Sequence, residues 1–365
     1  MSDKRKCILK TALISAVSTI LFCFLVHYFT MSDIEKLSML VHTKYAGEID
    51  AASLSQGAAE GMLGALNDPH SVYMSEEEYQ AFLEELESVY VGIGVEIQLV
   101  DGKMQVVRTV PDSPAAIEGI EEGDIIEKVD DITVTEETYE AAVQHMRKKD
   151  DKVLSVTILR DGAEKTFSVS RDTISVETVV DKQYDDVFYI ALRGFDVPTA
   201  KEMRASLAKA EESGAKSIIL DVRNNPGGLL ESVTEIADML LPACTVVYTE
   251  DKDKERDFIY ESDAEYIDKK LVVLINENSA SASEILAGTL KDNSRAKLVG
   301  TKTYGKGSVQ NLYKLRDGAV KLTIAHYFTP GGYIIDKNGI TPDYVVENRG
   351  SEDVQLQKAL ALARE

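Results

Sequence analysis

Three short segments combine small residues with polar groups able to act on a bound molecule. The first is Asn224-Asn225-Pro226-Gly227-Gly228. A Pro-Gly-Gly turn can aim successive main-chain N–H groups outward and so form an anion-binding nest or an oxyanion hole. A plain turn between a strand and a helix explains the same letters, and it is the better interpretation of this segment taken alone.

The second segment is Ser279-Ala280-Ser281-Ala282-Ser283-Glu284, at the predicted start of a helix. The positive end of the helix dipole would stabilise an alkoxide on a serine placed there. Ser281 and Glu284 also fit the S-x-x-E capping box, which is purely structural. In isolation the capping role is favoured.

The third segment is Gly305-Lys306-Gly307-Ser308-Val309-Gln310. Burial of Lys306 would lower its pKa and make it a base, whereas a solvated lysine in a glycine turn is the simpler interpretation. The stretch 300–307 resembles a phosphate-binding P-loop. It has Gly307 where the P-loop needs Ser or Thr, and strands are predicted after it instead of a helix, so nucleotide binding is disfavoured.

Other catalytic classes find little support. The sequence has neither G-x-S-x-G nor H-E-x-x-H, and its three cysteines form no metal-binding cluster. His70 and His326 are isolated, which is typical of structural histidines. A hydrolase would therefore need a base other than histidine, and a Ser–Lys arrangement supplies one.

Two patterns of hydrophobic residues would position these segments. Residues 33–88 show helical spacing, interrupted by a turn at 67–71, and Ser75 with Glu78 predicts a capping box. From residue 89 a module of strands and two short helices follows, at 89–99, 104–110, 113–116, 125–129, 139–146 and 153–160. From residue 187 strands and helices alternate, which predicts an α/β fold, at 188–192, 198–212, 217–222, 229–241, 271–275 and 282–290. A short helix is expected at 353–364.

The chain has 365 residues, with 40 Lys and Arg against 62 Asp and Glu, and a net charge of −22. Its length predicts two or three domains. An acidic chain of this kind is a poor nucleic-acid binder, because phosphate binding needs a basic surface.

The N-terminus carries a basic cluster, Lys4 to Lys10, followed by residues 11–30 without any Asp, Glu, Lys or Arg. A helix of that length matches the thickness of a bilayer core, and the basic flank predicts a cytoplasmic N-terminus. No small-x-small cleavage pattern ends the segment, so a single-pass anchor is preferred to a cleaved signal peptide or a soluble helix.

The order and spacing of the motifs resemble the carboxyl-terminal processing (tail-specific) proteases. That family carries N-N-P-G-G, S-A-S-A-S-E and G-K-G-x-V-Q segments in this order, as at 224–228, 279–284 and 305–310. Further landmarks are Asp68-Pro69-His70-Ser71, Gly92-Ile93-Gly94 and the segment 339–343.

The resemblance implies roles for individual residues. Ser281 would be the nucleophile, Lys306 the general base, and Gln310 the residue that orients Lys306. The oxyanion hole would be formed by Gly227 or Gly228 together with Ala282. Neither a metal nor a cofactor is implied. For Asp292 two roles are equally favoured, either support of the site or a position on the surface.

The module at 89–173 resembles a PDZ domain, whose carboxylate-binding loop captures a peptide C-terminus. The residues implied in peptide binding are Val91, Gly92, Ile93, Gly94, Val95 and Arg147. Arg147 matches the family, but Lys148-Lys149-Asp150-Asp151 replaces the G-P-x-G-T that often follows it.

The expected fold is an α/β protease core with an inserted PDZ domain of the α+β type and an N-terminal helical region after one transmembrane helix. The expected boundaries are 1–30, 31–88, 89–173, 174–350 and 351–365. The hypothesis is a membrane-anchored serine endopeptidase outside the cytoplasm, acting on C-terminal or unstructured polypeptide tails without nucleic acid. Its N-terminal helices would support a homodimer. The competing hypothesis is an inactive PDZ scaffold.

Overall fold

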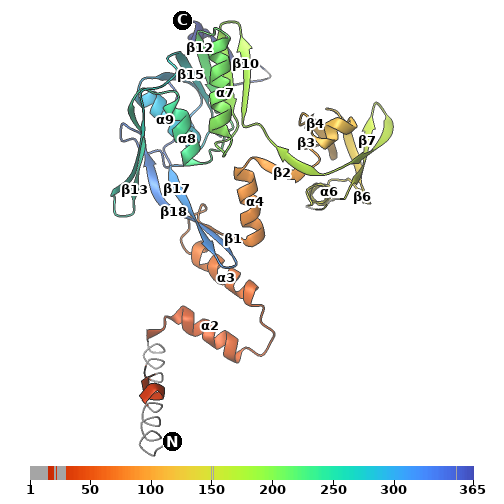
Figure 1. Ribbon diagram of the computed structural model, residues 1–365, viewed down its shortest axis with the longest axis vertical. Coiled ribbons are helices and arrows are strands. Elements are labelled where there is room, and N and C mark those ends of the chain that lie inside the picture. Colours follow the sequence, from red (N-terminus) through yellow and green to blue (C-terminus); the bar gives the residue numbers. More distant parts are fainter. Residues whose placement is uncertain (1–14, 20–21, 23–29, 149, 151, 351) are drawn as a thin grey trace, which may run out of the picture. The chain divides into compact units, whose positions relative to one another are not determined.

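A computed structural model describes residues 15–19, 22, 30–148, 150, 152–350 and 352–365 (Figure 1). The predicted membrane segment, 11–30, lies mostly outside these residues. Within the described part of the chain, no helix is both long and apolar enough to cross a bilayer.

The chain divides into two compact units, and the first ends at Ala65. Its described residues include the helices α2 (Asp33–Lys44) and α3 (Ala51–Gly64). Helix α2 begins with a capping box, in which Ser32 N–H donates to Glu35 Oε2 at 2.7 Å. The apolar side chains of Ile34, Leu37 and Leu40 on α2 are at least half exposed, so this unit by itself leaves an apolar helix face uncovered.

The second unit, residues 66–365, opens with strand β1 (Val72–Ser75) and helix α4 (Glu76–Leu86). The capping box of Ser75 and Glu78 is confirmed, with Ser75 N–H donating to Glu78 Oε2 at 2.7 Å. Strand β1 was predicted as part of a helical region. It forms because it pairs antiparallel with a distant strand, β18 (Gly318–Phe328), with Val72 opposite Lys321.

Residues 89–175 form a β-rich module with its own buried core. The predicted strand 89–99 is divided by a turn at Ile93-Gly94, where Gly94 has φ +84° and a Cβ would lie 2.1 Å from Ser113 Cβ. The module's elements are β2 (Val89–Gly92), β3 (Val95–Val100), β4 (Lys103–Thr109), α5 (Pro114–Glu118), β5 (Ile125–Val129), β6 (Ile132–Thr133), α6 (Tyr139–Met146), β7 (Leu154–Arg160), β8 (Ala163–Val169) and β9 (Asp172–Ser175).

The α/β region is built on a six-stranded sheet in the order β10-β11-β12-β15-β16-β19, parallel except for β10. One large apolar cluster joins it to α7, α8 and α9, and a smaller cluster joins it to α10, so the sheet is covered on both faces. The elements are β10 (Val179–Tyr184), β11 (Val187–Leu192), α7 (Thr199–Glu212), β12 (Ser217–Asp221), α8 (Leu230–Asp238), β15 (Lys270–Ile275), α9 (Ala282–Asp292), β16 (Ala296–Gly300), β19 (Tyr344–Val345) and α10 (Val354–Arg364).

A second sheet has the order β1-β18-β13-β14, with β17 also paired to β18. Its remaining strands are β13 (Cys244–Asp251), β14 (Arg256–Ser262), β17 (Ser308–Leu315) and β18 (Gly318–Phe328). A strand, not a helix, therefore follows Gly307. This confirms that the P-loop-like letters at 300–307 do not form a P-loop.

Candidate active site

Ser281 lies at the start of α9, where the chain enters the helix from the loop after β15. Its backbone has φ +52° and ψ −113°, a conformation that is strained for a residue with a side chain. The Ser281 N–H donates to Glu284 Oε2 at 2.9 Å, while the Glu284 N–H donates to the Ser281 carbonyl at 2.8 Å. A residue held in this conformation is fixed by its surroundings, as expected for a positioned nucleophile.

The Asn-Asn-Pro-Gly-Gly turn lies directly against Ser281. A Cβ on Gly227 would be 2.8 Å from Ser281 Cβ and 3.0 Å from Ala282 N. The fully buried Asn225 holds the turn, since its Nδ2 donates to the Leu192 carbonyl at 2.9 Å and its Oδ1 accepts from Gly227 N at 2.9 Å. Only glycine allows the backbone to approach this closely.

The hydrogen bonds distinguish between the two glycines predicted for the oxyanion hole. Gly227 N–H is already engaged by Asn225. Within the described residues, Gly228 N–H and Ala282 N–H have no main-chain or side-chain acceptor. A developing oxyanion beside Ser281 could therefore accept from Gly228 and Ala282, which favours Gly228 over Gly227 for this role.

Lys306 is partly buried between β16 and β17. Burial lowers the pKa of its ammonium group, and the charge of Lys321 lowers it further, while Asp68 and Glu284 act in the opposite direction. Of the two interpretations left open by the sequence, the partly buried lysine is the one in the structure. A lowered pKa gives a larger fraction of the neutral base.

Glu284 connects the serine and lysine segments, and the sequence identified it only as a capping residue. It is fully buried and accepts four hydrogen bonds, and its burial raises its pKa. The spacing of the capping box predicts the hydrogen bond between Ser281 and Glu284. The other three donors lie about twenty residues further along the chain, beyond the reach of that local pattern. The donors are Ser281 N (2.9 Å), Thr303 Oγ1 (2.5 Å), Gly305 N (2.7 Å) and Lys306 N (2.8 Å).

Not every implied contact is formed. Gln310 Nε2 donates to Ser308 Oγ at 2.8 Å and to Thr323 Oγ1 at 3.2 Å. Among the residues that the structure describes, no hydrogen bond joins the Lys306 ammonium group to Ser281 or to Gln310. The structure thus brings the Ser281 and Lys306 segments together, but the two side chains are not hydrogen-bonded to each other in the described residues.

Asp292 lies at the other end of α9 from Ser281. Its Oδ2 accepts from Thr329 Oγ1 at 2.5 Å and from Gly331 N at 2.8 Å. Eleven residues of helix separate it from Ser281, which is about 16 Å of rise. Asp292 therefore fixes the loop after β18, and among the described residues its side chain makes no hydrogen bond to the site.

The Asp68–Ser71 loop adjoins the site. Burial lowers the pKa of His70, and the charge of Lys306 lowers it further. Ser71 Oγ donates to Asp68 Oδ2 at 2.6 Å and accepts from Thr323 N at 3.0 Å, which ties the loop to β18. His70 is thus a neighbour of Lys306, a placement that its isolation in the sequence did not show.

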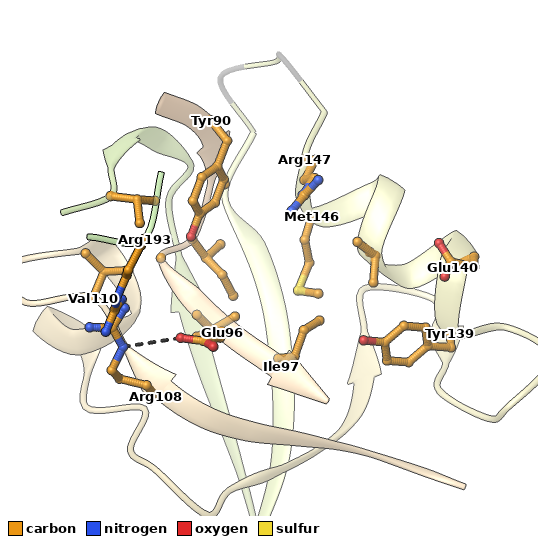
Figure 2. Close-up of a pocket in the computed structure, with 16 residues that line it drawn as sticks. Tyr90, Glu96, Ile97, Arg108, Val110, Tyr139, Glu140, Met146, Arg147 and Arg193 are labelled. Carbon is orange, nitrogen blue, oxygen red and sulfur yellow. Dashed lines mark hydrogen bonds and ion pairs between the residues drawn. The ribbon is translucent and has the colours of Figure 1, made fainter. Parts of the chain in front are cut away.

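The module at 89–175 contains a pocket of about 460 Å³ between β3 and α6 (Figure 2). Gly92, Ile93, Gly94, Val95 and Arg147 line it as the resemblance implies. Val91 does not line the pocket; it pairs with Thr173 between β2 and β9.

Comparisons with known proteins agree with this architecture. Residues 186–346 match peptidase family S41, residues 91–170 match the PDZ domain, and residues 25–78 match the N-terminal domain of the activating protease CtpB. The CtpA-like serine protease of Staphylococcus epidermidis is 34% identical over 346 residues, which cover 92% of this chain and 70% of the relative. The chain belongs to peptidase family S41.

A second relative and a solved structure support the assignment. The CtpA-like serine protease of Staphylococcus haemolyticus is 36% identical over 85% of this chain and 63% of its own length. The photosystem II D1 C-terminal processing protease superposes with a TM-score of 0.54 at 28% identity, covering 87% of each chain. The chain spans about two thirds of the length of the curated relatives that it matches. The expected α/β protease core with an inserted PDZ domain is confirmed.

Proposed function

We propose that this S41 chain is a serine endopeptidase in which Ser281 is the nucleophile and Lys306 the general base. The observation that carries the proposal is the strained Ser281, which lies against the Asn224–Gly228 turn and is tied through Glu284 to a lysine of lowered pKa. Neutral Lys306 takes the proton of Ser281 as its hydroxyl attacks a peptide carbonyl. The resulting lysinium protonates the leaving amine, and water then hydrolyses the acyl-enzyme.

Gly228 and Ala282 would stabilise the oxyanion, and Gln310 would orient Lys306 in the complex with substrate. The second role requires Gln310 to exchange its bonds to Ser308 and Thr323 for one to the lysine. Catalytic hydrogen bonds often form only when substrate is bound, so the present side-chain positions are compatible with this step.

The substrates we propose are C-terminal or unstructured tails of exported polypeptides, bound through the PDZ module. Strand β3 is at the edge of its sheet and is free to add a peptide strand. The basic N-terminus and the uncharged segment 11–30 support a single-pass anchor with the catalytic part outside the cytoplasm. The exposed apolar face of α2 supports a homodimer through the N-terminal helices.

Proteolysis of an unfolded protein tests this function. The full chain, purified in detergent, should degrade a casein-like substrate, while Ser281→Ala should not. Degradation by Ser281→Ala at the wild-type rate would refute the assignment. An inactive PDZ scaffold is the second candidate, and it would be favoured if the wild type bound C-terminal peptides but cleaved no unfolded substrate.

A further inference from the structure

The pocket of the PDZ module includes two residues from outside that module, Val176 and Arg193. Arg193 directly follows β11 of the protease core, yet it lines the pocket together with residues of β3 and α6. In Figure 2, Arg193 and Arg108 lie on one side of the pocket, and Arg147 and Met146 lie on the other. The pocket is thus completed by the core.

The guanidinium groups in the pocket differ in what they contact. Arg108 Nε is 3.3 Å from Glu96 Oε2, so its charge is paired. Arg147 lies over the ring of Tyr90, with 5.3 Å between its Cζ and the ring centroid. Within the described part of the chain, the Arg193 side chain has no hydrogen bond and no ion pair, so its charge is available to a ligand.

The other groups in the pocket fit the end of a peptide. Ile93 N–H and Gly94 N–H, in the turn between β2 and β3, have no main-chain acceptor among the described residues. The apolar side chains of Ile97, Val143 and Met146 line the same pocket. The two N–H donors and the Arg193 guanidinium group can bind a carboxylate. The apolar side chains can pack against the side chain of the last residue of the peptide.

Arg193 is held in place by the core backbone. Its N–H donates to the Thr178 carbonyl at 2.8 Å, and Asn225 Nδ2 donates to the Leu192 carbonyl just before it. Phe195, two residues later, donates to the Gly227 carbonyl at 3.0 Å and accepts from Leu229 N–H at 2.6 Å. Arg193 therefore belongs to the backbone segment that supports the turn beside Ser281.

We propose that Arg193 is a specificity residue of the protease core that binds the C-terminal carboxylate of a peptide in the PDZ pocket. The inference rests on the proposed function and refines its substrate class. A tail with a free carboxylate would be recognised jointly by the module and by the core. A tail with a blocked C-terminus would lose the contact to Arg193.

Peptide binding to the full chain carrying Ser281→Ala tests this role without requiring cleavage. The probes are two fluorescent peptides of one sequence ending in Val, one with a free carboxylate and one with a C-terminal amide. Adding Arg193→Gln should weaken binding of the carboxylate peptide about tenfold or more and leave the amide peptide nearly unchanged. Arg193→Lys, which keeps the charge, should restore part of the preference.

Arg204→Gln is the matched control, because Arg204 is an exposed arginine on α7 of the same core. It should retain the wild-type preference for the carboxylate. The proposal is overturned if Arg193→Gln also retains that preference, or if it weakens both peptides equally. A wild-type chain that binds these peptides but cleaves no substrate would refute the proposed peptidase function. The ratio of the affinities for the carboxylate and amide peptides would still decide the role of Arg193.

Discussion

The main-chain N–H groups of Ser281 and Lys306 donate to the same atom, Oε2 of Glu284, at 2.9 and 2.8 Å. One buried carboxylate thus fixes the backbone at both the proposed nucleophile and the proposed base. Its other oxygen accepts from Thr303 Oγ1 and Gly305 N. The spacing of the two proposed catalytic segments therefore depends on Glu284, which makes it a positioning residue.

Replacing Glu284 should disturb both segments at once. Glu284→Ala leaves two buried main-chain N–H groups and one partly buried one without their acceptor, so we expect a loss of about 3 kcal/mol or more in the free energy of unfolding. Peptidase activity should fall with it. Urea unfolding and casein degradation measure the two effects, with Glu235→Ala on the exposed side of α8 as control. A variant with unchanged stability would show that these bonds contribute little.

The strain at Ser281 predicts a difference between two inactive variants. Ser281→Ala keeps the positive φ and a Cβ, whereas Ser281→Gly removes the steric conflict. We expect both to lose activity by on the order of 10⁴-fold or more. The glycine variant should be about 1 kcal/mol more stable than the alanine variant in thermal or urea unfolding. Equal stabilities would argue that the conformation is not strained.

The pH dependence should follow the pKa of Lys306. Burial lowers this pKa first and Lys321 lowers it further, and only the neutral amine can accept the proton of Ser281. Activity should therefore rise with pH, and this rising limb of the pH–activity profile should lie below the ordinary lysine pKa. Lys321→Met removes a positive charge that disfavours protonation, so the pKa of Lys306 should increase and the limb should move to higher pH.

The pH profile of kcat/KM for a peptide substrate measures that shift. Lys201→Met, on the exposed side of α7, removes one charge from elsewhere on the same core and should leave the limb in place. A limb that moves equally in both variants would reflect the net charge of the chain and not the neighbour of Lys306.

Gly228 should tolerate no side chain. Its φ is +146°, and a Cβ there would lie 2.4 Å from the Phe195 carbonyl oxygen. Gly228→Ala should cost about 2 kcal/mol or more of stability and lower kcat on the order of 100-fold by displacing an oxyanion donor. Gly102→Ala is the control: φ is +74° there, but no atom lies within 4 Å. It should cost only about 1 kcal/mol. An equal loss of stability in Gly228→Ala and Gly102→Ala would contradict a role for the close packing of Gly228 against Phe195.

Local sequence signals predicted many of the helices and strands. Helix α6 and strand β5 have the predicted bounds, and the capping box at Ser75 and Glu78 is formed. These features depend on neighbouring residues, such as apolar spacing and cap chemistry. Strand β1 and the β13–β14 pair were missed. Strand β1 has only four residues, and its partner β18 lies about 250 residues away.

The sequence by itself determined the candidate residues, their order and the family, because these are properties of residue type and spacing. It left open whether Ser281 is a cap or a nucleophile and whether Lys306 is solvated. Only the tertiary structure decided that Lys306 is partly buried and that Arg193 reaches the PDZ pocket. It also showed that Gly227 N–H donates to Asn225, whereas Gly228 N–H has no acceptor among the residues that the structure describes. Burial and hydrogen bonding between distant segments arise only when the chain packs, so no local pattern could encode them.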